Sequence, residues 1–241
     1  MQMSKIKILE TISETPYSRV SYCYLNDVKA VLKTKKEAII TNSIATELEI
    51  HQFLKKYDLC PEILDYDLLN NRIVYEYIEY PVENSEYNQV LLKIFGETLS
   101  KLHSLDYKNL AIDTFEEKIE SYRNMLSTSA TIEIQESFAL FDKLYKKPYK
   151  LAFCHNDLNK MNIFLDKNMK FIDWEYTGLN QPIYKIASIK KSFNLSSDQL
   201  DIFLKAYGQD FNPNEIEEFE VLVGFIEKIW QKVTNKLKTH R

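Results

Sequence analysis

The chain has 241 residues, of which 45% are hydrophobic and 27% charged, and its formal net charge is −4 at pH 7. Acidic and basic residues are interspersed, so we expect no nucleic-acid partner and no anionic membrane surface. Cys23, Cys60 and Cys154 are odd in number and show no C-x-x-C spacing, which excludes a disulfide framework and a zinc site. No apolar run approaches the ~18 residues of a membrane span, and no signal-peptide core is found, so a cytoplasmic protein is expected.

The first third of the chain has the pattern of a small β-sheet with one helix. Asn26-Asp27 is typical of a hairpin turn. A helix is predicted from about Ile39 to Tyr57, ending before Pro61. Segments rich in β-branched and aromatic residues are predicted to be strands, at 6–14, 18–25, 28–34, 62–66 and 72–78.

Beyond Pro81 the hydrophobic pattern becomes helical, apart from one β island at 151–173. The predicted helices lie near 88–104, 114–128, 132–146, 182–193, 196–207 and 213–238. This order predicts an α+β fold of two lobes, with residues 1–78 in a sheet-and-helix lobe and residues 79–241 in a mainly helical one. Ligands commonly bind in clefts between such lobes.

The β island combines three oxygen-bearing side chains. If Lys167-Asn168 form a two-residue turn, residues whose numbers sum to 335 face each other, and Asn162 then lies opposite Asp173. An amide oxygen and a carboxylate at about 5 Å suit Mg²⁺, a hard cation that also accepts phosphate oxygens. Asp157, in the preceding loop, is then placed to orient a hydroxyl group and accept its proton.

Simpler interpretations exist for the same residues. A lone aspartate in a loop usually caps a turn, and Asp157 and Asp173 fit that role individually. His155 is grouped with the catalytic residues, although a structural histidine that holds backbone carbonyls is the simpler interpretation. Cys154 and His155 do not form a thiolate pair, because neighbouring strand residues point to opposite faces.

The predicted helix carries one charged residue on its apolar face. At about 100° per residue, Glu47 aligns with Ile40, Ile44, Leu48, His51 and Leu54. A carboxylate that faces a core needs a cation, and Lys33 on the third strand is the expected partner. A lysine held by a helix glutamate and directed at nucleotide phosphates is the arrangement found in kinases. Alternatively, Lys33 is solvated and Glu47 lies at the edge of the stripe.

No glycine occurs in the first 95 residues, which excludes both common glycine-rich phosphate-binding loops. Phosphate contacts would then come from backbone amides and hydroxyls between the first two strands, with Ser18 foremost. An ordinary polar hairpin loop with Pro16 at its turn is the alternative. The residues of this loop are Ser13, Thr15, Ser18 and Arg19.

The β island also carries a family resemblance. His155-x-Asp157-x-x-x-x-Asn162, followed by Ile172-Asp173-Trp174-Glu175-Tyr176, resembles the choline/ethanolamine kinase and aminoglycoside phosphotransferase superfamily, whose fold is protein-kinase-like. The second motif is most similar to bacterial choline kinases. Residues 74–79 and 96–103 share in the likeness.

This resemblance implies a transferase that uses ATP and Mg²⁺. It implies Asp157 as catalytic base, with Asn162 and Asp173 as the Mg²⁺ ligands and Lys33 and Glu47 as the phosphate-directed pair. It also implies that residues 1–78 form the nucleotide-binding lobe and residues 79–241 the catalytic and acceptor-binding lobe. Backbone groups that contact adenine are expected from Glu76, Tyr77 and Ile78.

The acceptor implied by the resemblance is a small cationic alcohol, most of all choline. Aromatic faces and a carboxylate suit such a cation, and the substrate-binding residues we expect are Glu175, Tyr176, Tyr184 and Trp230. A tryptophan at helical spacing is also a common core residue. Ethanolamine, thiamine, an aminoglycoside or a sugar on the same scaffold are alternatives.

Lys185 departs from the family pattern, which has an aspartate that braces the catalytic loop. This departure and the glycine-free loop favour a second hypothesis, a silent nucleotide-binding protein that acts through a partner. Asp157, Asn162 and Asp173 favour the enzyme. The protein is expected as a monomer or a homodimer.

Overall fold

The computed structural model describes residues 5–15, 17–36, 41–79, 81–82, 87–147 and 149–239. The chain forms two compact units. One comprises residues 1–86 with 157–177, and the other comprises residues 87–156 with 178–241. This differs from the predicted division at residue 78, because residues 157–177 pack with the first unit.

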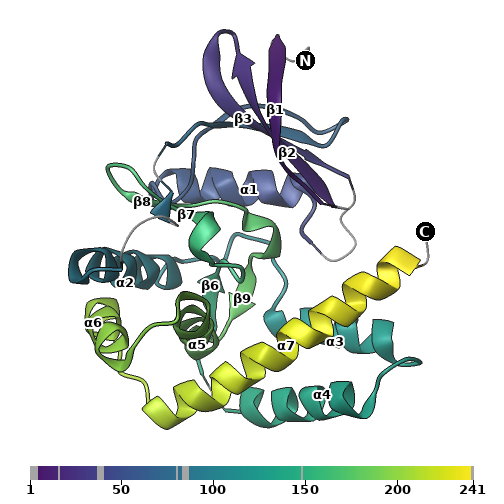
Figure 1. The fold of residues 1–241 in the computed structure, drawn as a ribbon, viewed down its shortest axis with the longest axis vertical. Coiled ribbons are helices and arrows are strands. Elements are labelled where there is room, and N and C mark those ends of the chain that lie inside the picture. The colour runs from purple at the N-terminus through teal and green to yellow at the C-terminus, as the bar shows by residue number, and fades with distance from the viewer. Residues whose placement is uncertain are drawn as a thin grey trace. The chain divides into compact units, whose positions relative to one another are not determined.

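The first unit contains a five-stranded antiparallel sheet in the order β1-β2-β3-β5-β4 (Figure 1). Asn26 and Asp27 both have positive φ, at 48° and 68°, as the predicted hairpin turn requires. All five predicted strands are confirmed within two residues at their ends. They are β1 (Ile6–Glu14), β2 (Ser18–Leu25), β3 (Val28–Lys35), β4 (Ile63–Asp67) and β5 (Arg72–Glu76).

One helix, α1 (Ile44–Lys55), packs against β5 beneath this sheet (Figure 1). Its first turn is capped by Ser43, whose hydroxyl accepts a hydrogen bond from the Thr46 amide. The predicted start at Ile39 and the expected face residue Ile40 lie outside the described residues. The helix ends two residues earlier than predicted, and Ile44 and Leu48 pack on the sheet residues Ile73 and Tyr75.

The segment 157–177 completes the first unit with two short strands and two 3₁₀ turns. It runs through η2 (Lys160–Asn162), β7 (Ile163–Leu165), β8 (Met169–Phe171) and η3 (Trp174–Tyr176). The Phe171 amide donates to the Leu59 carbonyl at 2.9 Å, and Pro81 pairs with Phe164. These contacts attach the hairpin to the N-terminal part of the chain.

The predicted register of this hairpin is wrong by one residue. Ile163 pairs with Phe171, so the numbers of facing residues sum to 334. Asp166 belongs to the turn, because its amide donates to the Asn168 carbonyl at 3.2 Å. Asn162 therefore accepts a backbone hydrogen bond from Ile172, at 3.0 Å, and is not directly opposite Asp173.

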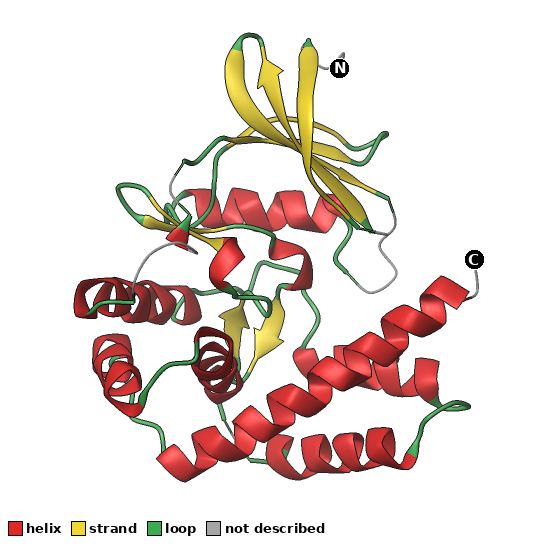
Figure 2. Cartoon of the chain, in the orientation of Figure 1, coloured by secondary structure: helices red, strands yellow, loops and turns green. Residues whose placement is uncertain are grey.

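The second unit is mainly helical, as predicted (Figure 2). Side chains of Asn88, Thr114, Thr131 and Ser196 cap four of its helices at their N-termini. Its helices are α2 (Gln89–His103), α3 (Phe115–Leu126), α4 (Ile132–Tyr145), α5 (Pro182–Phe193), α6 (Ser197–Tyr207) and α7 (Pro213–Thr239). The described helices include none with the length and apolar character of a membrane span.

Two features position the helices of this unit. Gly96 on α2 lets α6 approach closely, because a Cβ atom there would lie 2.5 Å from the Phe203 carbonyl oxygen. The long helix α7 crosses α3 and α4 (Figure 1). A two-stranded ribbon of β6 (Ala152–Cys154) and β9 (Gly178–Asn180) leads into and out of the segment that belongs to the first unit. The fold class is α+β, as predicted.

Candidate functional site

The predicted pair of Lys33 and Glu47 forms in the interior of the first unit. Lys33 Nζ lies 3.0 Å and 3.1 Å from the two carboxylate oxygens of Glu47. Both residues are buried, and the Tyr75 hydroxyl donates a third hydrogen bond to Glu47 Oε1, at 3.0 Å. The interpretation of Lys33 as a solvated surface residue is therefore wrong.

Two further carboxylates reach Lys33. Its ammonium group lies 2.7 Å from Asp173 Oδ1 and 3.3 Å from Glu175 Oε2. Lys35 supplies a second buried ammonium group, 3.3 Å from Glu175 Oε2 and 3.8 Å from Glu47 Oε2. We call these five residues the lysine–carboxylate cluster. Sequence reasoning missed Lys35, although residues two apart on a strand share a face.

Burial and charge act in opposite directions on the groups of this cluster. Burial alone would raise the pKa of Glu47, but Lys33 and Lys35 outweigh it and bring that pKa to about 2. Burial alone would lower the pKa of Lys33, but Glu47, Asp173 and Glu175 raise it well above its ordinary value. Lys33 and Glu47 are therefore both charged at neutral pH.

His51 is a buried neighbour of the cluster that the sequence placed on the same helix face. Its ring lies against Tyr75, with centroids 4.9 Å apart, and only 3% of the residue is exposed. Burial lowers the pKa of His51 to about 4, despite the opposing charge of Glu47. The imidazole is therefore neutral at pH 7.

Asp173 owes its position to an unusual backbone conformation. Its φ and ψ are 65° and 60°, in the left-handed region that aspartate tolerates better than most residues. The carboxylate pairs with Lys33 and is nevertheless 37% exposed. Asp173 thus presents an anionic group to solvent at the edge of the buried lysine–carboxylate cluster.

Asn162 and Asp157 are joined across the loop that precedes β7. The Asn162 Nδ2 group donates to the Asp157 backbone carbonyl at 2.8 Å and to its carboxylate Oδ2 at 3.2 Å. Asn159 adds to the loop by accepting from the Met161 amide at 2.9 Å. The asparagine amide is thus fixed through its nitrogen, and the Asp157 carboxylate is held in one orientation.

The oxygen donors of this region suit Mg²⁺ by their chemistry. Asp173 provides a partly exposed carboxylate, and Asn162 has its nitrogen engaged by Asp157, so its oxygen is the group left for a cation. Within the described parts of the chain, no cluster of three or more His, Cys, Asp or Glu side chains has the arrangement of a metal site. An amide and one carboxylate, as predicted here, would not form such a cluster.

His155 belongs by packing to the second unit, where it is fully buried after β6. Its neighbour Cys154 places Sγ 3.4 Å from Nε2 of His103, a different histidine. Burial raises the pKa of Cys154 to about 12, so its thiol is protonated at neutral pH.

The residues predicted to contact adenine follow directly from β5. Glu76 ends that strand, and its carboxylate accepts a hydrogen bond from Lys170 Nζ at 2.7 Å. Tyr77 and Ile78 are half-buried, and the ammonium group of Lys29 lies 3.6 Å from the Tyr77 ring centroid. The backbone of 76–78 thus leaves the sheet beside the β7–β8 hairpin, to which the Glu76–Lys170 contact joins it.

The loop predicted to contact phosphate is closed by its own side chains. Thr15 Oγ1 accepts hydrogen bonds from the amides of Tyr17 and Ser18, at 3.2 Å and 3.0 Å. Arg19 pairs with Glu14 at 2.8 Å, and Pro16 lies outside the described residues. These contacts are those of an ordinary polar hairpin loop, the alternative interpretation, and Ser18 is buried.

The four residues predicted to bind the acceptor are not gathered in one unit. Glu175 is buried in the lysine–carboxylate cluster, and Tyr176 follows it in η3. Tyr184, in the second unit, is 5% exposed and packs its ring 4.7 Å from that of Phe115. Trp230 is 36% exposed on α7. The structure therefore places Tyr184 in an aromatic core, which is the simpler role for such a residue.

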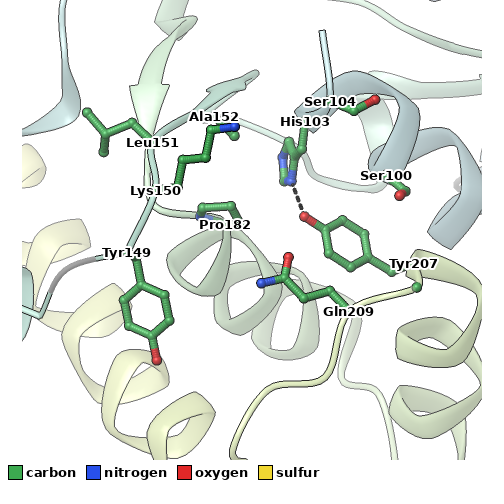
Figure 3. Close-up of a pocket in the computed structure, with 11 residues that line it drawn as sticks. Ser100, His103, Ser104, Tyr149, Lys150, Leu151, Ala152, Pro182, Tyr207 and Gln209 are labelled. Atoms are coloured by element: carbon green, nitrogen blue, oxygen red, sulfur yellow. Dashed lines mark hydrogen bonds between the residues drawn. The ribbon is translucent and has the colours of Figure 1, made fainter.

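Lys185 lies on α5 and is 1% exposed. Burial, assisted by the charge of Lys185, lowers the pKa of His103 to about 3. His103 Nδ1 lies 2.9 Å from the Tyr207 hydroxyl in a pocket of about 280 Å³ within the second unit (Figure 3). None of the predicted site residues lines this pocket.

Comparison with known proteins decides the family. The profile of the Phosphotransferase enzyme family matches residues 18–219, which is most of the chain and includes the lysine–carboxylate cluster. The chain belongs to the phosphotransferase enzyme family. The resemblance carried by the Asp157, Asn162 and Asp173 motifs is therefore confirmed.

Individual relatives agree with this family. Protein LicA homolog of Mycoplasma capricolum subsp. capricolum is 26% identical over 183 residues, 75% of this chain and 74% of that protein. Ethanolamine kinase 2 of Rattus norvegicus is 23% identical over 232 residues, 80% of this chain and 60% of that protein. The solved structure of choline kinase LicA from Streptococcus pneumoniae matches with a TM-score of 0.76 and 18% identity, over 98% of this chain and 87% of that one. The fold is thus the predicted two-lobed, protein-kinase-like one.

Proposed function

We propose that this protein is a Mg-ATP-dependent kinase that transfers the γ-phosphoryl group to the hydroxyl of a small cationic alcohol, with choline as the foremost acceptor. The observation that carries the proposal is the lysine–carboxylate cluster, in which buried Glu47 holds Lys33 beside the carboxylate of Asp173. The family match and the names of the relatives, a LicA homolog and an ethanolamine kinase, support the same class of reaction.

Phosphoryl transfer requires positioning and charge stabilisation more than covalent chemistry by the protein. In the proposed mechanism Lys33 binds the nucleotide phosphates, and Glu47 keeps its ammonium group charged and directed, as the raised pKa of Lys33 favours. Asn162 and Asp173 would hold Mg²⁺, which when bound would neutralise charge on the phosphates. Glu76, Tyr77 and Ile78 offer backbone groups to the adenine.

Asp157 is proposed to orient the acceptor hydroxyl and to accept its proton. The hydrogen bonds from Asn162 to the carbonyl and carboxylate of Asp157 support this role, because they fix the direction of the carboxylate. Full burial of His155 supports a part in shaping the catalytic loop, with no direct contact to the acceptor. Of the acceptor contacts expected from the sequence, Tyr176 and Trp230 remain proposed, whereas the burial of Glu175 and Tyr184 favours structural roles for them.

The test is an ADP-release assay with Mg-ATP against choline, ethanolamine, thiamine and aminoglycosides. We expect one alcohol to stimulate ADP formation, and we expect Asp157→Ala to lower kcat by at least about 100-fold, the usual contribution of a general base. Asp166→Ala is the matched control, because Asp166 is an exposed aspartate in the turn of the same hairpin.

Two outcomes would contradict the proposal. Full activity of Asp157→Ala would remove the assignment of the base. ATP binding by calorimetry without turnover on any acceptor would identify the silent nucleotide-binding protein instead. Stimulation by ethanolamine, an aminoglycoside or thiamine would keep the kinase and replace choline as the acceptor.

A further inference from the structure

Lys35 is a buried cation to which the proposed mechanism assigns no task. Only 2% of its side chain is exposed, and it extends from β3 on the same face as Lys33. Its ammonium group lies between Glu175 Oε2, Glu47 Oε2 and the backbone carbonyl of Asn42. A fully buried lysine is stable only with such partners, so these contacts specify the position of the Lys35 ammonium group.

The charges of the cluster show why one lysine is insufficient. Lys33 alone faces three carboxylates, and its shortest contact is with Asp173, at 2.7 Å. Glu175 Oε2 is buried and accepts no hydrogen bond from the described residues, so its charge is balanced by two ammonium groups at 3.3 Å each. When Lys33 turns to a phosphate, Lys35 is the cation that remains beside Glu175.

Asn42 connects Lys35 to the backbone that follows Asp173. The Asn42 amide donates to the Glu175 carbonyl at 2.7 Å, and its side-chain Nδ2 donates to the Thr177 carbonyl at 3.0 Å. The Asn42 carbonyl in turn accepts the hydrogen bond from Lys35 Nζ. Lys35 therefore holds residues 173–177 in two ways, through the Glu175 carboxylate and through Asn42.

We propose that Lys35 is a positioning residue that fixes the 173–177 segment, and with it the Asp173 carboxylate, so that Lys33 is free to exchange Asp173 for a nucleotide phosphate. Lys35 itself contacts neither nucleotide nor acceptor in this role. The expected effect of Lys35 on catalysis rests on the proposed function. Its structural part concerns only contacts within the first unit.

Hydrogen exchange tests the structural part without nucleotide or metal. In Lys35→Met, which keeps the length of the side chain and removes its charge, amide exchange in peptides that cover 173–177 should become faster by about 10-fold or more. Lys55→Met is the matched control, because Lys55 is 69% exposed and pairs with exposed Glu62. Unchanged exchange in Lys35→Met would overturn the proposal, whether or not the protein is active.

Steady-state kinetics of Lys35→Met tests the expected effect on catalysis. Residues that hold a metal ligand in place typically contribute about 10- to 100-fold, so Lys35→Met should lower kcat by that factor and raise the Mg²⁺ concentration for half-maximal rate. The acceptor KM should stay within about twofold, because Lys35 does not contact the acceptor in this role. A loss of uniform binding would instead raise KM and leave kcat unchanged. A wild-type protein without activity would contradict the proposed function, and the exchange experiment would still decide the role of Lys35.

Retention of the positive charge separates positioning from a direct contact. Glu175 Oε2 lies 3.3 Å from Lys35 Nζ, so a side chain that keeps the positive charge should keep this tie and slow exchange at 173–177. Lys35→Arg should retain at least half of the wild-type kcat. If Lys35→Arg is as impaired as Lys35→Met in exchange at 173–177 and in kcat, the proposal fails.

Discussion

Removal of the Glu47 charge is the sharpest test of the lysine–carboxylate cluster. The pKa of Glu47 lies at about 2 in the folded protein, against an ordinary value of 4.5. A shift of one pKa unit corresponds to about 1.36 kcal/mol, so the difference is worth about 3 kcal/mol of folding free energy at neutral pH. Glu47 is 1% exposed, so solvent screening removes little of this. Glu47→Gln should therefore destabilise the protein by about 3 kcal/mol, within the range for a broken buried ion pair.

The pH dependence gives the prediction its sign. The folded pKa of Glu47 is lowered, so its contribution is complete above pH 4.5 and is lost as the pH falls from 4.5 towards 2. The difference between wild type and Glu47→Gln should consequently be largest at pH 7 and clearly smaller at pH 3. A pH-independent difference would mean that the glutamine acts through packing, and the charge argument would be wrong.

Urea unfolding followed by tryptophan fluorescence measures the free energy of unfolding of the first structural unit, which contains the cluster. The chain has two tryptophans, and Trp174 is fully buried beside the cluster. In a Trp230→Phe background, emission therefore reports the first unit alone. Glu62→Gln is the matched control, because Glu62 is half-exposed and pairs with Lys55, an exposed type of pair worth at most about 1 kcal/mol. Equal stability of the two variants would refute the reasoning.

Two further predictions concern stability. Gly96→Ala should cost about 1–3 kcal/mol by overpacking α2 against α6. Gly224→Ala would meet only the far end of the Lys191 side chain, so it should be neutral or stabilising in thermal melts. Because burial lowers the pKa of His51 from 6.5 to about 4, the unfolded state binds the extra proton. The free energy of unfolding should thus fall as the pH drops from 6.5 to 4, and this loss should be smaller in His51→Gln. If urea unfolding at several pH values gives the same pH dependence for both proteins, the assignment is contradicted.

The elements of the fold could be predicted from the sequence wherever short-range patterns decide them. β-Branched and aromatic content and the Asn26-Asp27 turn located the strands, and the helical hydrophobic pattern located the helices. Long-range packing could not be predicted in the same way. Strand β9 is three residues long and exists only because it pairs with β6, and residues 157–177 join the first unit through contacts with Leu59 and Pro81.

The site was predicted unevenly for a related reason. The Lys33–Glu47 contact could be inferred because a carboxylate on an apolar helix face requires a cation. Lys35 was missed because a lysine at the end of a strand usually reaches solvent, and the partner that buries it, Glu175, lies 140 residues away in the sequence. Contacts over such separations depend on tertiary structure that local patterns do not encode.

The error in the hairpin register shows which interaction places Asp173. The prediction relied on cross-strand pairing with Asn162, yet Asn162 faces Ile172. Asp173 instead leaves the ladder through a left-handed residue conformation, and the ammonium group of Lys33 at 2.7 Å holds its carboxylate. A side chain held by charge, and not by the ladder, can change partners without disturbing the sheet. The proposed function requires such a change of partner, because Asp173 would release Lys33 to a nucleotide phosphate and would hold Mg²⁺.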